Sequence, residues 1–373
     1  MLRFHFLNVL HGSSIVIEYH PVGAAASFGV VDSNARENDP VPALEKLQSL
    51  GAEALSFVAL THPHRDHYSG MHRLLQAFQG KIDQFICFPF GGLFASPNRL
   101  KKYANILKQL LLQGDDPEIR SSFVELINIL QWGDLHRPLW QESDGTSTDL
   151  ALLGFDGVSA KTILPPRTAK GSFIEQIESG RLEGFGSSNE NSLSLSLLFD
   201  YGGCRVLLSG DSTKANWLER RRGYERRGGQ TANATVVNLP HHGSAHDCDA
   251  DVLQGIFAGQ NDAAPRFAIT SADGHSHPDY QIIRWCSENG IQPFCTNLMP
   301  QCGANILKLH TVKNLAPELS RWLGEVTIDS GHRQTCQGDI CVEIPGDGAI
   351  NVSPQHANYC PLRTGNLNLP FAV

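Results

Sequence analysis

Residues 62–67 read His-Pro-His-Arg-Asp-His, which places three imidazoles and one carboxylate within six positions. They follow an apolar run of strand length, residues 54–60, and precede residues 68–78, where apolar residues recur at helical spacing. In α/β units, functional side chains collect on loops at the carboxyl ends of strands. Because imidazole nitrogens and carboxylate oxygens bind Zn²⁺, iron and Mn²⁺, the stretch predicts a metal site in an α/β fold. The alternatives are a solvated His-rich loop and a closed structural zinc site, and structural zinc sites usually rely on cysteine.

The 16 histidines are unevenly distributed along the chain. Eight of them fall within 15 residues, at positions 62–67, 241–246 and 275–277, where a uniform scatter would place about 0.6. The second and third stretches also follow strand-like apolar runs, at residues 234–239 and 267–270. The order of strand, loop with His and Asp, and helix therefore recurs, and composition alone favours a site built from histidines.

Length, charge and cysteine usage exclude several classes of protein. The chain has 373 residues, 41% of them apolar, and a net charge of −8, so a large core can form and a generally basic nucleic-acid-coating protein is excluded, though a local basic groove is not. Nine cysteines without regular spacing indicate reduced thiols in a cytoplasmic protein. No apolar run reaches the roughly 18–20 residues of a membrane span, and the amino-terminal residues lack the order of a secretory signal. We therefore expect cytoplasmic localisation without membrane insertion.

The segment between the first His-rich stretch and residue 191 differs from its surroundings. Two amphipathic helices are predicted, over residues 97–112 and 117–131, each with a proline near its start. Loops are predicted over residues 141–149 and 180–191. We interpret residues 91–185 as a helical lid or insertion, with a second small domain as the alternative. A hairpin follows, turning at Gly202-Gly203 and ending at Asp211.

Several of these segments, taken in order, resemble one superfamily. VVDSN with Asp32, HPHRDH, LLSGD with Asp211, and PHHGS with His241 and His242 resemble the motifs of metallo-β-lactamase-fold hydrolases. FLNVLHGSSIVIE, NENSLSLSLLFDYGGCRVLLSGD, NLPHHGS and DGHSHPDY are most similar to the hydrolase domain of the competence protein ComEC and its soluble relatives. The resemblance covers most of residues 1–300 and implies a four-layer αββα sandwich over residues 1–302. Within this domain, residues 91–185 would form the helical insertion. Residues 303–373 would form a carboxyl-terminal extension packed on the core.

The resemblance also implies a ligand set for one or two divalent ions, Zn²⁺ or Mn²⁺. His62 and His64 would hold one metal, Asp66 and His67 the second, and Asp211 would bridge the two. Either His242 or His241 would complete the second site. The chain departs from the superfamily at the place of a further histidine, where residues 187–191 read Ser-Ser-Asn-Glu-Asn. This departure predicts an oxygen or amide ligand, weaker occupancy of the first site, and a preference for Mn²⁺.

Other residues are assigned roles around the metals. Asp66 would orient the attacking water or take its proton, Asp32 would orient a ligand histidine from behind, and His277 would contact a substrate phosphate or protonate the leaving group. His11 is also compatible with a turn histidine that has no ligand role. The remaining candidate substrate contacts are His11, Asn189, Asn191, His275, Arg220 and Arg221.

The metals alone do not select a substrate, because the same site hydrolyses phosphodiesters, lactams, lactones and thioesters. Residues 214–227 carry six basic and two acidic side chains, a net charge of +4. Such a strip beside the site is compatible with a phosphate backbone and equally with a solvated helix end. The resemblance to the ComEC hydrolase domain implies phosphodiesterase or nuclease activity. We therefore expect a metal-dependent hydrolase of phosphodiesters, acting on single-stranded DNA, RNA or a nucleotide. The alternatives are an acyl hydrolase of lactonase or thioesterase type, and a metal-binding subunit with protein partners in a defence or competence system.

Overall fold

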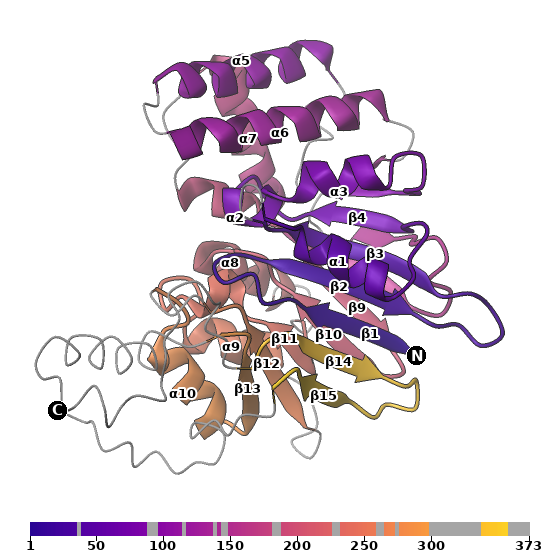
Figure 1. Ribbon diagram of the computed structural model, residues 1–373. Coiled ribbons are helices and arrows are strands. Elements are labelled where there is room, and N and C mark those ends of the chain that lie inside the picture. Colours follow the sequence, from indigo (N-terminus) through magenta and orange to yellow (C-terminus); the bar gives the residue numbers. More distant parts are fainter. Residues whose placement is uncertain are drawn as a thin grey trace, which may run out of the picture.

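Two mixed β-sheets form the centre of the computed structural model, and helices lie outside them (Figure 1). The structure describes residues 1–35, 39–87, 96–113, 117–136, 140–142, 148–180, 188–225, 232–258, 265–272, 276–297 and 337–356. The first sheet has eight strands in the order β15-β14-β1-β2-β3-β4-β5-β6, and the second has seven in the order β13-β12-β11-β10-β9-β8-β7.

The strands of the first sheet are β1 (Leu2–Phe6), β2 (Ser14–Tyr19), β3 (Ser27–Ser33), β4 (Phe57–Leu60), β5 (Phe85–Cys87), β6 (Trp140–Glu142), β14 (Ile340–Ile344) and β15 (Asn351–Pro354). The strands of the second sheet are β7 (Thr148–Leu150), β8 (Ser159–Leu164), β9 (Ser196–Tyr201), β10 (Cys204–Leu208), β11 (Val236–Asn238), β12 (Arg266–Thr270) and β13 (Ile291–Cys295).

The helices form the outer layers (Figure 1). On the side of the first sheet these are α1 (Pro42–Ser49), α2 (Arg65–Tyr68), α3 (Met71–Ala77), α5 (Pro97–Gln113), α6 (Pro117–Leu135) and α7 (Arg167–Ser179). On the side of the second sheet these are α8 (Lys214–Glu225), α9 (Ala250–Phe257) and α10 (Tyr280–Glu288). Two short 3₁₀ helices, η2 (Ser188–Leu193) and η3 (Pro240–Gly243), lie in loops. This layer order is αββα, so the expected four-layer α/β sandwich is confirmed.

Alternation along the strands explains how the two sheets pack. In β10, Val206 and Leu208 lie in the core between the sheets, whereas Leu207 lies in the core beneath α9 and α10. This is the period of two expected for a strand that is buried on both faces. The aromatic ring of Phe4 in β1 meets that of Phe199 in β9 edge-on, at a centroid distance of 5.4 Å. Apolar contact across the interface therefore fixes the first sheet on the second.

Parallel pairing gathers the loops that carry the predicted motifs. β3, β4 and β5 run parallel in the first sheet, and β10, β11 and β12 run parallel in the second. Polar loops follow the carboxyl ends of β4, β10, β11 and β12, and parallel strands end at a common edge. The recurring strand–loop–helix order in the sequence therefore translates into loops that can meet in one place.

The structure corrects two predicted elements. The single helix expected over residues 68–78 is two helices, α2 and α3, and α2 begins at Arg65, so that Asp66 and His67 lie in a helical turn. The segment 91–185 is not wholly helical, because β6 joins the first sheet while β7 and β8 join the second. The loop predicted over residues 141–149 was wrong at both ends, where β6 and β7 lie. Short polar strands at sheet edges lack the apolar alternation by which a strand is predicted. The helices over 97–112 and 117–131 are confirmed by α5 and α6.

No helix in the described part of the chain is long and apolar enough to cross a membrane. The six cysteines within the described residues are all free thiols: Cys87, Cys204, Cys248, Cys286, Cys295 and Cys341.

A buried ion cluster ties the carboxyl-terminal strand β14 to the start of the chain. The Glu18 carboxylate in β2 lies 3.1 Å from Nε2 of His5 and 2.5 Å from Nε2 of His20. Arg3 contacts Glu18 at 3.4 Å and donates from Nε to Glu343 of β14 at 2.6 Å. Burial alone would raise the pKa of Glu18, but the hydrogen bonds from His5 and His20 outweigh it and lower that pKa to about 2.

We expect Glu18→Gln to destabilise the protein at neutral pH by about 1 to 3 kcal/mol, because it removes the charge that these donors share. A carboxylate whose pKa is lowered by folding contributes stability above its unfolded value of 4.5, and that stability is lost as the pH falls toward 2. Urea unfolding midpoints of the variant and the wild type should therefore converge as the pH falls from 4.5 toward 2. Glu53→Gln, at an exposed position, is the control. A gap that is constant with pH would contradict the prediction.

Candidate metal centre

The HPHRDH stretch folds into a tight connection between β4 and α2. His62 follows β4 and is fully buried, His64 is the N-cap of α2, and Asp66 and His67 occupy its single turn. Gly12 lies against this turn with φ +101°, and a Cβ there would come within 2.1 Å of the Asp66 carbonyl oxygen. The loop after β1 therefore fits the metal loop only because residue 12 has no side chain.

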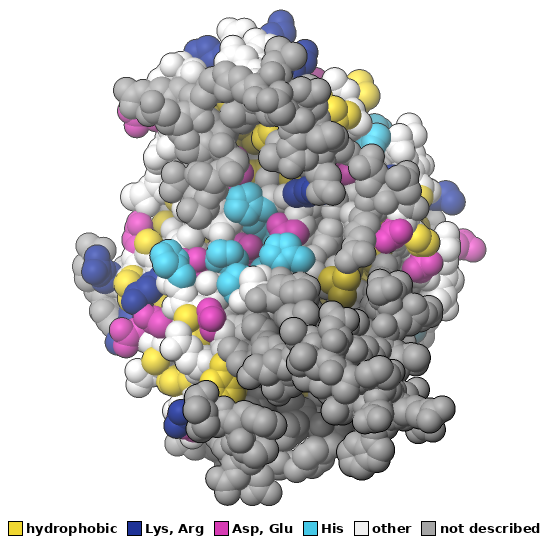
Figure 2. Space-filling view, turned by 60° about the vertical axis from the view of Figure 1, so that its left-hand side comes forward, with side chains coloured by type: hydrophobic (Ala, Val, Ile, Leu, Met, Phe, Trp, Pro, Cys, Tyr) yellow, Lys and Arg dark blue, Asp and Glu magenta, His cyan; other side chains and the backbone are white. Residues whose placement is uncertain are grey.

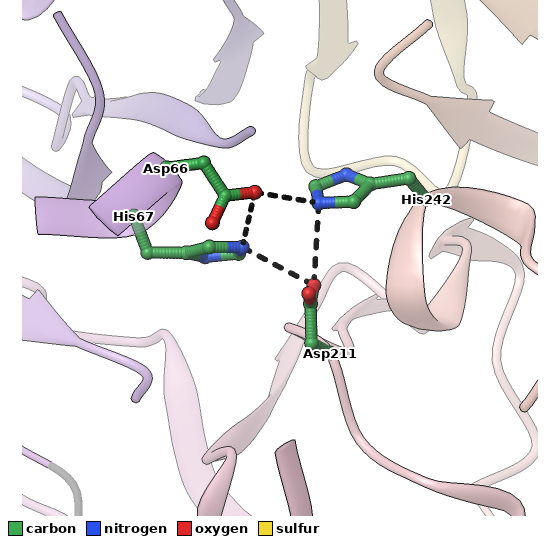
Figure 3. Close-up of side chains that lie close together, drawn as sticks. All are labelled: Asp66, His67, Asp211 and His242. Atoms are coloured by element: carbon green, nitrogen blue, oxygen red, sulfur yellow. Dashed lines mark ion pairs between the residues drawn. The ribbon is translucent and has the colours of Figure 1, made fainter. Parts of the chain in front are cut away.

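One group of ligand atoms comes from both halves of the molecule (Figure 3). Asp66 and His67 lie on α2, Asp211 follows β10, and His242 lies on η3. Asp211 Oδ1 is 3.2 Å from Nε2 of His67 and 3.5 Å from Nε2 of His242. Asp66 Oδ2 is 3.7 Å from Nε2 of His67 and 3.4 Å from Nε2 of His242. Two carboxylates and two imidazoles thus alternate around one point.

A second group shares Asp211 with the first. It consists of His62, His64 and Asp211, whose ligand atoms all lie within 4.8 Å of one another. Nε2 of His62 lies 3.7 Å from Oδ2 of Asp211. Asp211 thus presents one carboxylate oxygen to each group, which is the arrangement of a bridging ligand.

The distances between these ligand atoms, and the lack of hydrogen bonds to several of them, fit divalent metal ions. Tetrahedral Zn²⁺ with bonds of 2.0–2.2 Å separates its ligand atoms by about 3.4 Å, and the four contacts around the first group span 3.2 to 3.7 Å. Within the described residues, four buried atoms of the cluster make no hydrogen bond: Nε2 of His62, His67 and His242, and Oδ1 of Asp211. Buried polar atoms are otherwise almost always bonded, so their convergence indicates a cation site.

The electrostatics of the cluster lead to the same conclusion. Burial alone would raise the pKa of Asp211, but His242 and His67 hold it well below its usual range. Burial would lower the pKa of His67, yet Asp211 and Asp32 raise it far above its usual value. Burial and the neighbouring His67 keep the pKa of His62 low, so its imidazole is neutral. The carboxylates thus attract positive charge to their centre, and a metal ion would take the place of the proton on His67.

Asp32 holds His67 from behind, as its place at the end of β3 predicted. Its Oδ2 accepts from Nδ1 of His67 at 2.7 Å and from the Thr61 hydroxyl at 2.8 Å, and its Oδ1 accepts from the Thr61 backbone N–H at 2.8 Å. A hydrogen bond at Nδ1 fixes the tautomer that leaves the Nε2 lone pair facing the metal point. Asp32 is fully buried and acts through His67, so it is a positioning residue.

The Asp211 loop is positioned by its own neighbours. Gly210 has φ +54°, and a Cβ there would lie 2.3 Å from Oγ of Ser194. The same Ser194 hydroxyl accepts the Asp211 backbone N–H at 2.9 Å. The Gly210 carbonyl accepts the backbone N–H of His241 at 3.0 Å. The loop after β10 therefore also fixes the His241–His242 loop.

Histidines and acidic side chains gather in the middle of one face of the molecule (Figure 2). His11 is 57% exposed, and its Nε2 lies 3.2 Å from Oδ2 of Asp66. The ring of His277 lies 5.6 Å from that of His241 and 6.5 Å from that of His242. His11 and His277 thus approach the metal cluster from opposite sheets, and both predicted substrate contacts lie at the site.

The two groups contain six of the seven predicted ligands: His62, His64, Asp66, His67, Asp211 and His242. The seventh, His241, lies beside them, with Nε2 3.8 Å from Oδ2 of Asp211. Asn191 is buried, and its amide nitrogen lies 3.4 Å from Nε2 of His241. Asn189 falls within η2, but its side chain is outside the described part, as is the whole of His275.

The basic strip on α8 is only partly available to a substrate. Arg220 donates from Nη1 to the carbonyl of Ile163 in β8 at 2.7 Å, and Lys214 forms an ion pair with Asp249. Arg221 follows on α8, with its side chain partly buried, and residues 226 and 227 lie outside the described residues. Arg220 thus contacts the second sheet through Nη1, and the substrate contacts expected of Arg220 and Arg221 stay predictions.

Three residues of the site were not predicted from sequence. Glu190 is buried on η2, with its carboxylate 3.4 Å from Nε2 of His64. Asp247 accepts from Nδ1 of His241 at 2.7 Å, and Thr61 bonds Asp32 as described above. The acidic residue between Asn189 and Asn191, and the acid six positions after His241, were the available signals.

Comparisons with known proteins place the chain near two solved structures. Neither a family model nor a curated protein matches the sequence. Zn²⁺-bound PqqB from Methylobacterium extorquens matches with 11% identity and a TM-score of 0.37, over 77% of this chain and 86% of that one. A β-lactamase domain protein from Burkholderia ambifaria matches with 16% identity and a TM-score of 0.33, over 68% of each chain. What the site can do follows from its own geometry: an αββα sandwich with a buried His and Asp cluster suited to two metals.

Proposed function

We propose that the protein is a metal-dependent hydrolase of phosphodiester bonds, related to the hydrolase domain of ComEC. The observation that carries the proposal is the shared Asp211, which gives each group of ligand atoms one carboxylate oxygen. Paired metal sites of this kind are typical of phosphatases and nucleases, in which two ions clamp the attacking and leaving oxygens. Single-stranded DNA, RNA and nucleotides are the substrates we propose.

Bound metal ions would supply a water of lowered pKa and positive charge for the developing oxyanion. The two carboxylates of the cluster differ in access, because the Asp66 side chain is 19% exposed and that of Asp211 only 3%. Asp66 Oδ2 is therefore the group placed to orient the attacking water and hold its proton. Asp211, enclosed by imidazoles, holds the two groups in register.

Two histidines beside the cluster, His11 and His277, have a separate role. His11 lies beside Asp66, and His277 lies beside His241 and His242 on the opposite side. An imidazole in either place is within reach of a substrate phosphate lying across the cluster. We assign substrate contact to His11, and phosphate contact or leaving-group protonation to His277.

We expect the metal-loaded protein to hydrolyse bis-p-nitrophenyl phosphate and single-stranded DNA, to lose this activity on treatment with a chelator, and to regain it with Mn²⁺ or Zn²⁺. A panel of lactones and thioesters assayed with the same metals tests the acyl hydrolase alternative. Turnover of acyl substrates alone would overturn the phosphodiester assignment. Inactivity on every substrate, with metals bound, would overturn it in favour of a metal-binding subunit.

A further inference from the structure

The site of His62, His64 and Asp211, called the first metal site below, lacks the histidine expected at residues 187–191. The structure offers a replacement from another loop. Nε2 of His241 lies 3.8 Å from Oδ2 of Asp211. This is the oxygen that Nε2 of His62 approaches at 3.7 Å. Each carboxylate oxygen of Asp211 therefore faces two imidazoles: Oδ1 faces His67 and His242, and Oδ2 faces His62 and His241.

An unusual backbone lets two consecutive histidines face one cluster. His241 has φ 45° and ψ 52°, and His242 has φ 52° and ψ 22°. Both are in the left-handed region, which costs a residue other than glycine about 1 to 3 kcal/mol. Such strain persists at sites where the surrounding structure requires it. Here it turns the His242 ring toward Oδ1 of Asp211 and the His241 ring toward Oδ2.

The partner on the other ring nitrogen of His241 repeats the construction found at His67. Asp247 Oδ2 accepts from Nδ1 of His241 at 2.7 Å, the distance that separates Asp32 from Nδ1 of His67. Metal-binding histidines almost always donate their second N–H in this way. Asp247 is itself buried and is held by the backbone N–H of Lys214 at 3.3 Å. Asp247 thus orients His241 in the same way that Asp32 orients the ligand His67.

Glu190 and Asn191, which lie where the superfamily has its further histidine, contact the imidazoles of this site. Glu190 contacts Nε2 of His64 at 3.4 Å, and the Asn191 amide nitrogen contacts Nε2 of His241 at 3.4 Å. The amide oxygen of Asn191 is buried and makes no hydrogen bond within the described residues. Glu190 and Asn191 thus bring oxygen-bearing side chains to the first site, and the nitrogen ligand would have to come from another loop.

We propose that His241 is the third imidazole ligand of the first metal site, and that Asp247 is its positioning residue. The inference rests on the proposed function, since it assigns a ligand within the same two-metal site. Both members of the His241–His242 pair then bind metal, one at each site. A first site with three imidazoles suits Zn²⁺ as well as Mn²⁺.

The test is the metal content and affinity of His241→Asn, measured by calorimetry and elemental analysis after loading with Zn²⁺, and by visible absorption after loading with Co²⁺. We expect the wild type to bind two ions. The variant should keep one with unchanged affinity, bind the other at least about 10-fold more weakly, and show an altered Co²⁺ spectrum. Asp247→Asn should weaken the same ion by about 10-fold or more. His246→Gln removes an exposed imidazole that lies 3.3 Å from Oδ1 of Asp247, the oxygen that does not face His241, and should leave both ions in place.

Two results would contradict the inference in different ways. If His241→Asn, verified as folded by circular dichroism, binds two ions with wild-type affinity, then His241 is not a ligand, and the proposed hydrolase function is unaffected. If the wild type itself binds no divalent metal, the proposed function fails together with this inference.

Discussion

Asp211→Asn is expected to release both metal ions at once. Asp211 is the one residue common to the two groups of ligand atoms, and the amide replaces a shared negative charge with one neutral oxygen and an N–H group. Its N–H₂ group would face Nε2 atoms of the imidazoles, which could accept a hydrogen bond only with the lone pairs that the metals need. Substitutions behind a ligand cost about 10- to 100-fold in metal affinity, so the loss of a bridging ligand should exceed about 100-fold at each site.

Elemental analysis and titration calorimetry of Asp211→Asn measure this effect, and phosphodiesterase activity should fall in parallel. The matched control is Asp200→Asn, which removes a half-exposed carboxylate paired with Arg205 at 3.0 Å on the neighbouring hairpin. The control should bind two ions and retain activity. Retention of two tightly bound ions by Asp211→Asn would show that the sites do not share this carboxylate.

The fold was largely predictable because its site loops and its strands carry different local signals. The strand before HPHRDH, the hairpin turning at Gly202-Gly203 and the run before PHHGS each combine an apolar stretch with a polar turn, and all three are strands in the structure. Period-two alternation is fixed by backbone geometry. It can therefore be read from sequence where a strand is half-buried, whereas a strand buried on both faces, such as β4, appears as a short continuous apolar run.

The strands β6 and β7 were missed because edge strands need few apolar side chains. β6 and β7 have three residues each, and they pair at the outer ends of the two sheets. Their pairing depends on neighbours far away in sequence, as in the bond pattern between β5 and β6. Strand formation of this kind is decided by tertiary context rather than by local propensity.

The resemblance implied the ligand set and its division between two metals, but it left the places of His241 and His242 open. The sequence PHHGS leaves open which of His241 and His242 faces the cluster, because ring direction depends on φ and ψ. The two left-handed residues send both rings inward, toward different oxygens of Asp211. Glu190 and Asp247 were missed for a similar reason, since a carboxylate near a motif has no visible partner until the chain is folded.

Asp32→Asn is expected to lower the affinity of the second site by about 10- to 100-fold without unfolding the protein. Asp32 has φ 56°, and asparagine tolerates the left-handed region as well as aspartate does. The amide can still accept the Thr61 backbone N–H, which Asp32 accepts at 2.8 Å. Its N–H₂ group would then face Nδ1 of His67, which forces the proton of that ring onto Nε2, where the metal binds.

Because Asp32 acts through His67, the variant should show weaker metal binding and a higher metal concentration for half-maximal activity. Activity at saturating metal should recover most of the loss. Thermal unfolding should change little, whereas Asp32→Ala would leave the Thr61 N–H without an acceptor and lower the melting temperature. If Asp32→Asn lost activity that no metal concentration restored, while binding metal as the wild type does, Asp32 would have a direct part in the reaction rather than a positioning role.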